Sequence, residues 1–338
     1  MRSSEGGGNP AIDALFVDYN RPDVPGASVI VIRKALIVYA RAYGFANLEE
    51  HTRASTRTNY RLASLTKQFT AMAVMMLAKD GKLHFDDRLT DALPGFPAYG
   101  SRIRIRHLLN HTSGLWDYED LIPEGQKEQL KDRDALELVK AKGATYFEPG
   151  SRFKYSNTGY ATLALVVETA SGRPFARFLK ERIFQPLGMD DTVAYEKGIS
   201  EVSNRAYGYT LEGAGFKRTD QSLTSAVLGD GGIYTSVMDL YKWDRALYSD
   251  RLVDRAILQL AVTPATLNDG SKTEYGFGWF VDRYRGRRLR YRHNGETVGF
   301  ENVIQRFPEE QLTVIILANR TGAQPWKIAE KIADRRLP

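Results

Sequence analysis

The chain has 338 residues, of which 43% are hydrophobic, 26% charged and 11% aromatic. These globular values exclude a mainly disordered or collagen-like chain, and the length suits about two domains or one large unit. The absence of cysteine excludes disulfides, thiolate zinc sites and a cysteine nucleophile. The sequence contains no apolar run of about 18 residues, so we expect no membrane span.

The first ten residues, M-R-S-S-E-G-G-G-N-P, lack the apolar core of a signal peptide. We therefore expect a periplasmic or secreted protein if a signal peptide has been removed, and otherwise a cytoplasmic one.

The net charge of +6 comes mainly from arginines in two stretches, 102–106 and 283–292. In the second stretch, Tyr284 and Tyr291 interleave with the arginines, as on some nucleic-acid-binding surfaces. We favour a solvated hairpin face, because a modest basic patch attracts anions without defining a function. A polyanion-binding protein is the less favoured alternative, and no nucleic-acid partner is expected.

The N-terminal third begins with two apolar runs, 27–32 and 35–40, which predict a pair of strands. Residues 62–80 predict a helix that is buried on all sides, because residues 71–78 are all apolar, and Gly81 marks its end. Further helices are predicted at 136–140, at 160–170, at 175–184 (ended by Pro186 and Gly188) and at 236–247, where Ser236 is the N-cap.

The C-terminal part is rich in predicted strands, at 277–282, 288–293, 300–307 and 312–317, followed by a helix at 325–334. Strands at both ends with helices between them predict an α/β (α+β) protein whose central antiparallel sheet is built from both chain ends. The expected sheet domain comprises residues 10–62 and 266–338, and residues 63–265 form a mostly helical domain. The active-site cleft is expected where the two meet.

A first motif, S-L-T-K at 64–67, begins the buried helix. Ser64 and Lys67 are three residues apart and therefore lie on one helical face. A serine there also suits a helix cap, but a lysine in the first turn opposes the helix dipole. A desolvated amine beside a hydroxyl can accept the hydroxyl proton.

A second motif, Y-S-N at 155–157, follows the turn signal E-P-G-S and precedes a predicted helix. The phenol of Tyr155 is a candidate general acid or base, and the amide of Asn157 can bind both an amine and a carbonyl. Taken alone, the tripeptide also fits a loop with a helix cap.

A third motif, H-N-G at 293–295, ends a predicted strand and is followed by Glu296. Glycine lets a substrate lie against the strand edge, where backbone groups can pair with it. A lone histidine on a strand is more often structural. His107 and His111 are also interpreted as structural, because no glutamate lies between them as in a zinc protease.

The order S-x-x-K, Y-x-N and H-x-G resembles the serine β-lactamase and penicillin-binding-protein superfamily, in particular its class C β-lactamase-like branch of DD-carboxypeptidases and carboxylesterases. Three further segments agree with this resemblance: 107–115 (H-L-L-N-H-T-S-G-L), 147–157 (F-E-P-G-S-R-F-K-Y-S-N) and 275–279 (Y-G-F-G-W). The likeness spans about residues 20–320 and implies the β-lactamase/transpeptidase-like fold.

The resemblance implies a cofactor-free and metal-free serine hydrolase that acts on a small amide or ester through an acyl-serine intermediate. Ser64 would be the nucleophile, Lys67 its activating partner and Tyr155 the proton shuttle. Substrate would be bound by Asn157 and by the third motif, His293, Asn294 and Gly295, with Glu296. The backbone N–H groups of Ser64 and Glu296 would form the oxyanion hole.

Two residues depart from the usual pattern of this superfamily. His293 stands where β-lactamases usually have lysine, and Glu296 stands where a small residue is usual. A histidine near pH 7 is largely neutral, so His293 offers a substrate carboxylate less positive charge than a lysine would. This disfavours an efficient β-lactamase. Because the sequence also offers no dedicated deacylation carboxylate, a penicillin-binding sensor without turnover, or an inactive relic, is the alternative. The sequence leaves open whether the natural substrate is a β-lactam, a D-peptide or an ester. It also leaves the oligomeric state open.

Overall fold

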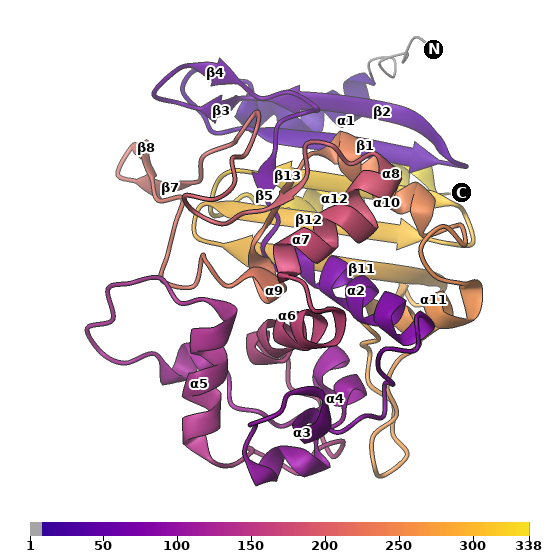
Figure 1. Ribbon diagram of the computed structural model, residues 1–338. Coiled ribbons are helices and arrows are strands. Elements are labelled where there is room, and N and C mark those ends of the chain that lie inside the picture. Colours follow the sequence, from indigo (N-terminus) through magenta and orange to yellow (C-terminus); the bar gives the residue numbers. More distant parts are fainter. Residues whose placement is uncertain (1–8, 338) are drawn as a thin grey trace.

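The computed structural model describes residues 9–337, and its centre is a six-stranded antiparallel sheet (Figure 1). The strand order is β10-β11-β12-β13-β1-β2, so strands from both ends of the chain pair in the middle of the sheet, where β1 lies beside β13. This confirms the predicted fold class. The strands are β1 (Ala27–Arg33), β2 (Leu36–Tyr43), β10 (Phe280–Tyr284), β11 (Arg288–Thr297), β12 (Phe300–Phe307) and β13 (Leu312–Ala318).

Both faces of the sheet are buried, because alternate side chains of each central strand enter different hydrophobic cores. In β1, Ile30 and Ile32 join the larger core, whereas Val29 and Val31 join the smaller one. The smaller core is covered by α1 (Pro10–Asp13), the 3-10 turns at Ala14–Tyr19 and α12 (Pro325–Arg336). The larger core lies against α10 (Val237–Ala246) and α2 (Lys67–Lys79).

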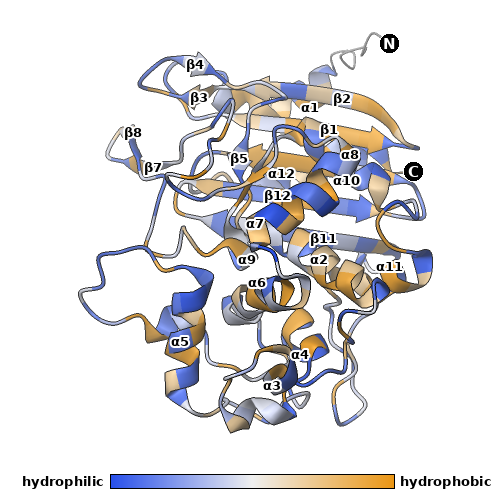
Figure 2. Cartoon of the chain, viewed as in Figure 1, coloured by the Kyte–Doolittle hydropathy of each residue, from blue (hydrophilic) through white to orange (hydrophobic). Residues whose placement is uncertain are grey.

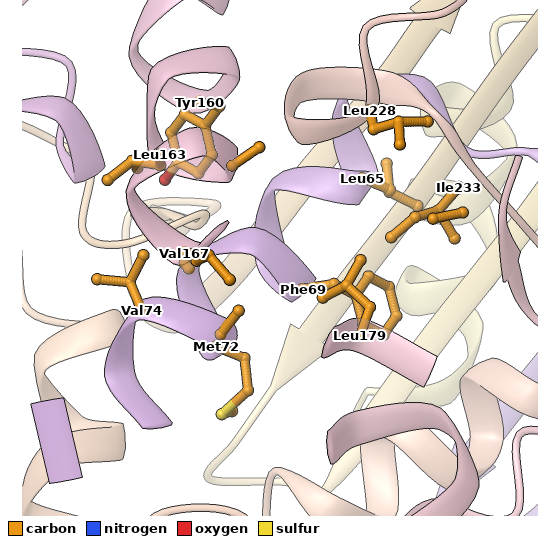
Figure 3. Packing of buried hydrophobic residues seen from close by; sticks show 14 of the residues in the cluster. Leu65, Phe69, Met72, Val74, Tyr160, Leu163, Val167, Leu179, Leu228 and Ile233 are labelled. Carbon is orange, nitrogen blue, oxygen red and sulfur yellow. The ribbon is translucent and has the colours of Figure 1, made fainter. Parts of the chain in front are cut away.

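Helix α2 is the centre of the larger core and is buried all round, as predicted: every residue from Lys67 to Leu77 is buried. It packs against α6 (Asn157–Ser171), and Figure 3 shows side chains of α2 between Tyr160 and Val167 of α6 and Leu179 of the next helix. The buried helix therefore carries Lys67 at its N-terminus into an apolar interior.

The remaining elements surround this core, and α5 shows an apolar and a polar side in Figure 2. The helices are α3 (Leu89–Ala92), α4 (Ile105–Leu109), α5 (Asp132–Lys142), α7 (Phe175–Leu179), α8 (Gln185–Leu187), α9 (Leu228–Gly231) and α11 (Arg255–Ala261). The short strands are β3 (Phe45–Asn47), β4 (Thr52–Arg53), β5 (Tyr60–Arg61), β6 (Val193–Ala194), β7 (Tyr209–Glu212), β8 (Gly215–Arg218) and β9 (Ile233–Thr235). Residues 9–337 contain no helix that is long and apolar enough to cross a membrane.

Some predicted boundaries are wrong for identifiable reasons. The helix expected at 175–184 continues past Pro186, because a π-helical turn at Lys180–Phe184 precedes the proline, and it ends at Gly188 with φ +68°. Strand β10 begins at Phe280 and not at 277, because Gly278 adopts φ +79° against the backbone of Lys67. Strand β11 continues past His293 to Thr297.

The arginine-rich hairpin is less solvated than predicted. Arg290 is buried and pairs with Asp282 and Glu330, with nitrogen–oxygen distances of 2.9 Å and 3.0 Å. Arg285 pairs with Asp334 at 2.7 Å. Carboxylates therefore neutralise much of this charge. The division at 10–62, 63–265 and 266–338 stays a prediction, and its last residue, Pro338, lies outside the described residues.

Candidate active site

Ser64 lies on a 3-10 turn, Ala63–Thr66, that leads directly into α2. The residue before it, Ala63, has φ +50°, a left-handed conformation that costs an L-residue about 1–2 kcal/mol. The surrounding backbone fixes this conformation: Leu62 N–H donates to Ile233 O at 2.8 Å, and Asn302 Nδ2 donates to Arg61 O at 2.9 Å. Strands β9 and β12 thus hold the turn that presents Ser64.

Lys67, the first residue of α2, is completely buried, and its ammonium group has three hydrogen-bond acceptors. Its Nζ lies 3.0 Å from Ser64 Oγ, 2.8 Å from Asn157 Oδ1 and 3.1 Å from the backbone oxygen of Asp230. Burying an amine at the positive end of a helix is unfavourable, and these acceptors compensate for it. The structure therefore brings together the first two motifs, which are about 90 residues apart in the chain.

Asn157 is placed by the start of α6. Its backbone N–H donates to Asp117 Oδ2 at 2.8 Å, so Asp117 stabilises the helix N-terminus. Its side-chain amide then joins Lys67 to Glu119, because Nδ2 donates to Glu119 Oε1 at 3.2 Å. The helix begins here, three residues earlier than the predicted 160.

Tyr155 lies beside the same ammonium group, with Lys67 Nζ 5.1 Å from the centre of its ring. Its hydroxyl oxygen is buried and has no hydrogen-bond partner among the described residues. A buried hydroxyl without a partner is unfavourable, so this oxygen is an unsatisfied polar group beside the Lys67 amine. The ring is packed against His111, at 4.2 Å between ring centres.

The third motif lies on β11, which passes next to the Ser64 turn. A Cβ atom on Gly295 would collide with the backbone oxygen of Leu62, so glycine is required for this approach. The neighbouring Asn294 contributes its backbone oxygen, which lies 2.6 Å from His293 Nδ1. Glu296 is exposed and lines the cleft together with Ser64.

His293 is only 2% exposed and is neutral in this environment. Because a carbonyl oxygen only accepts, Nδ1 carries the proton, and Nε2 accepts from the Tyr275 hydroxyl at 2.9 Å. Burial, reinforced by the charge of Lys67, lowers the pKa of His293 to about 3. Arg290 and Arg292 instead bind Asp282. The β11 strand thus presents no histidine cation.

Sequence reasoning missed three groups beside Ser64: Tyr118, Glu119 and Asp230 also line the cleft. Asp230 is 6% exposed and accepts from the Tyr118 hydroxyl at 2.9 Å, and burial raises its pKa to about 7. The pKa of Glu119 is raised, first by desolvation and then by Asp117. The segments W-D-Y-E-D and G-D-G-G match none of the three motifs, and only their acidic residues were a signal.

The two other histidines considered in the sequence, His107 and His111, have structural contacts. His107 Nδ1 accepts from the backbone N–H of Arg104 at 3.2 Å, and His111 Nδ1 accepts from that of Ser156 at 3.2 Å. Within residues 9–337, no group of three or more His, Asp or Glu residues is arranged to hold a metal ion.

Comparisons with known proteins agree with this geometry. The Beta-lactamase family model matches residues 12–335. Penicillin-binding protein 4* of Bacillus subtilis (strain 168) is 32% identical over 356 residues, covering 96% of this chain and 78% of that protein. A penicillin-binding protein structure from Bacillus halodurans superposes with a TM-score of 0.80 at 28% identity, covering 99% of both chains.

A D-amino acid amidase from Ochrobactrum anthropi SV3, solved with L-phenylalanine amide, shares the fold. Its TM-score is 0.82 at 24% identity, covering 97% of this chain and 99% of that one. The family model spans nearly all of the chain, and the penicillin-binding relatives share both sequence and fold with it. The chain therefore belongs to the Beta-lactamase family.

Proposed function

We propose that the protein is a serine hydrolase that cleaves a small amide or ester, of the β-lactam, D-Ala-D-Ala-type peptide or carboxylic ester kind, through a covalent acyl-serine intermediate. The observation that carries this proposal is the buried Lys67 ammonium, which bridges Ser64 Oγ at 3.0 Å and Asn157 Oδ1 at 2.8 Å. A hydroxyl paired with a buried amine on a rigid turn is the arrangement of an activated nucleophile.

In the proposed acylation, Ser64 Oγ attacks the substrate carbonyl carbon, and Lys67 in its neutral form accepts the Oγ proton. As the tetrahedral intermediate collapses, the carbonyl–leaving-group bond breaks. Tyr155 then gives its hydroxyl proton to the leaving nitrogen or oxygen, and the Lys67 ammonium returns a proton to Tyr155. Protons balance over the step, and the free Tyr155 hydroxyl supports the role given to it.

The negative charge on the substrate oxygen would be stabilised by the backbone N–H groups of Ser64 and Glu296. The close approach of β11 at Gly295 supports this pairing, since it brings the backbone after Gly295 next to the Ser64 turn. Two such donors are commonly worth several kcal/mol in the transition state. Asn157 would hold the substrate amide. Water then hydrolyses the acyl-serine by the same proton path in reverse.

The test follows the intact mass of the protein and p-nitrophenol release with a p-nitrophenyl ester and with a penicillin. We expect Ser64-dependent ester turnover, with a loss of at least roughly a thousandfold in Ser64→Ala. Ser271→Ala is the matched control, because Ser271 is an exposed serine that does not line the cleft. A Ser64→Ala variant with wild-type turnover would refute the proposal.

The penicillin arm separates the alternatives. A penicilloyl adduct that persists on wild-type protein and is absent from Ser64→Ala indicates a penicillin-binding sensor without turnover. Rapid loss of penicillin indicates a β-lactamase. Ester turnover with no adduct and no penicillin loss indicates an esterase or peptidase on the same scaffold.

A further inference from the structure

A second cavity, of about 230 Å³, is lined by residues from the end of α10, from α11 and from β11 and β12. It shares no lining residue with the cleft beside Ser64. Most of its wall is apolar or aromatic, and includes Leu247, Leu258, Val262, Tyr248, Trp279 and Tyr291. Because an apolar cavity of about 150 Å³ binds benzene, this one has room for a ligand with one aromatic ring.

Arg306, on β12, also lines this cavity, although it is only 4% exposed. Its Nε donates to Asp244 Oδ1 at 2.8 Å, whereas its Nη2 is buried and has no hydrogen-bond partner among residues 9–337. Buried donors without an acceptor are rare and unfavourable in folded proteins. An acceptor bound in the cavity would account for this one.

Tyr248 adds a second unpartnered polar group to the same wall. Its hydroxyl is buried and has no hydrogen-bond partner in the part of the chain that the structure describes. The Cζ atom of Arg306 lies 4.5 Å from the centre of the Tyr248 ring, so both groups belong to one side of the cavity. A guanidinium N–H only donates and a hydroxyl can donate, so the pair suits a carbonyl oxygen, which can accept two hydrogen bonds.

The charges around the cavity favour a neutral ligand. Arg306 is neutralised by Asp244, and the side chains of this pair are only 5% and 2% exposed. Arg255, an exposed residue of the cavity wall, pairs with Asp250 at 3.9 Å. An anion would therefore have to compete with a carboxylate for either cation, and a buried anion also loses its hydration.

We propose that this cavity is a second ligand site, separate from the candidate active site, and that it binds a neutral compound with one aromatic ring and a carbonyl group. The carbonyl oxygen would accept from Arg306 Nη2 and from the Tyr248 hydroxyl, and the ring would lie among the apolar side chains. The proposal does not depend on the hydrolase activity, because the residues proposed for acylation do not line this cavity.

The test measures binding of acetophenone by calorimetry, with toluene and benzoate as comparison compounds. Acetophenone has a ring and a carbonyl group but no hydrolysable bond, so turnover at Ser64 contributes nothing to the signal. Toluene lacks the acceptor, and benzoate replaces the neutral carbonyl by an anion. We expect one acetophenone per chain, bound at least roughly fivefold more tightly than either comparison compound.

Tyr248→Phe tests where the compound binds. It removes one hydrogen-bond donor and should weaken acetophenone binding by roughly threefold to tenfold, with toluene binding unchanged. The melting temperature should not fall, because this hydroxyl has no partner to lose. Tyr241→Phe is the matched control, because Tyr241 lies on α10, does not line the cavity and donates to Ala35 O at 2.9 Å. It should bind acetophenone as wild type does.

Val262→Phe places a ring in the cavity and should abolish binding of both acetophenone and toluene. Circular dichroism checks that this variant folds, and Tyr248→Phe decides the question if it does not. Acetophenone binding that neither variant weakens would place the compound elsewhere and overturn the proposal. Toluene or benzoate binding as tight as that of acetophenone would overturn the ligand class. No saturable binding of acetophenone at millimolar concentrations would mean that the cavity holds only water, which would also overturn the proposal.

Discussion

The Nζ atom of Lys67 lies 3.0 Å from the Oγ atom of Ser64, at the end of a helix that is buried on every side. This relationship explains why a lysine is tolerated in an apolar core. Its remaining donors are bound by Asn157 and by the backbone of Asp230, so the amine is held in one position relative to the hydroxyl. Preorganisation of this kind lowers the cost of bringing the reacting groups together.

Asn157 is expected to be required for activity, because its side chain holds the Lys67 amine beside Ser64. Asn157→Leu keeps a similar volume but removes the acceptor for Lys67 and the donor to Glu119. We expect a loss of roughly tenfold to a hundredfold in kcat/KM for a p-nitrophenyl ester. Asn157→Asp instead adds a negative charge beside the amine and stabilises its ammonium form. We therefore expect kcat/KM of this variant to fall below that of wild type, and an unchanged kcat/KM would argue against this role of Asn157.

Gly295 is expected to be irreplaceable, because a Cβ atom there would collide with the Leu62 backbone oxygen and crowd Leu65. Gly295→Ala should cost about 1–3 kcal/mol in the free energy of unfolding, measured with urea, and should abolish most activity in the folded protein. Gly286→Ala is the control: it has φ +72° but open space around it, in a hairpin outside the cleft. It should cost about 1 kcal/mol and leave turnover unchanged. Equal effects on turnover would contradict this role of Gly295.

Much of the fold follows from hydrophobic patterning. The near-continuous apolar runs of β1 and β13 are required because both faces of these strands are buried. The apolar segment of α2 is required because α6, α9 and α11 pack around it. The strand order could not be predicted in the same way, since it depends on which runs pair. The helix through Pro186 was missed because a π-helical turn removes the conflict that proline normally causes.

The site was predicted in part. The three motifs indicated Ser64, Lys67 and Asn157, but their contact depends on the fold and not on spacing. The buried pairing of His293 with Tyr275 has no sequence signal, because it requires β11 to meet the segment that precedes β10. Glu119 and Asp230 were missed for the same reason: an acidic residue in a turn is usually solvated, and only the packing around it shows that it lines a cleft.

The strained backbone at Ala63 provides a test of how Ser64 is held. Ala63→Gly removes the steric cost of φ +50° but adds freedom to the unfolded chain, and we expect a net gain of roughly 0.5–1 kcal/mol in the free energy of unfolding. Ala71→Gly, at an equally buried position inside α2, should instead lose at least about 1 kcal/mol. Urea unfolding of both variants measures this contrast. A loss of stability in Ala63→Gly would show that the left-handed conformation is not a source of strain.

Asp230 should make the stability of the protein depend on pH. Burial raises its pKa from the ordinary 3.8 to about 7, although Lys67, the Tyr118 hydroxyl and Arg61 oppose the shift. The folded state thus binds this proton more tightly than the unfolded state. Its stabilising contribution is fully present below about pH 4 and is lost as the pH rises through about 7.

We therefore expect Asp230→Asn, which keeps an acceptor for Tyr118, to gain stability relative to wild type as the pH rises from about 4 to 7, by up to a few kcal/mol. The difference should level off above about pH 8. Tyr118→Phe removes a hydrogen bond that lowers the pKa of Asp230. In that variant, the stabilising contribution of the Asp230 proton should therefore persist to higher pH than in wild type. Urea unfolding at several pH values measures both differences. A relative stability of Asp230→Asn that falls with rising pH would mean that the folded state favours the charged carboxylate, and that Lys67 and Arg61 outweigh burial.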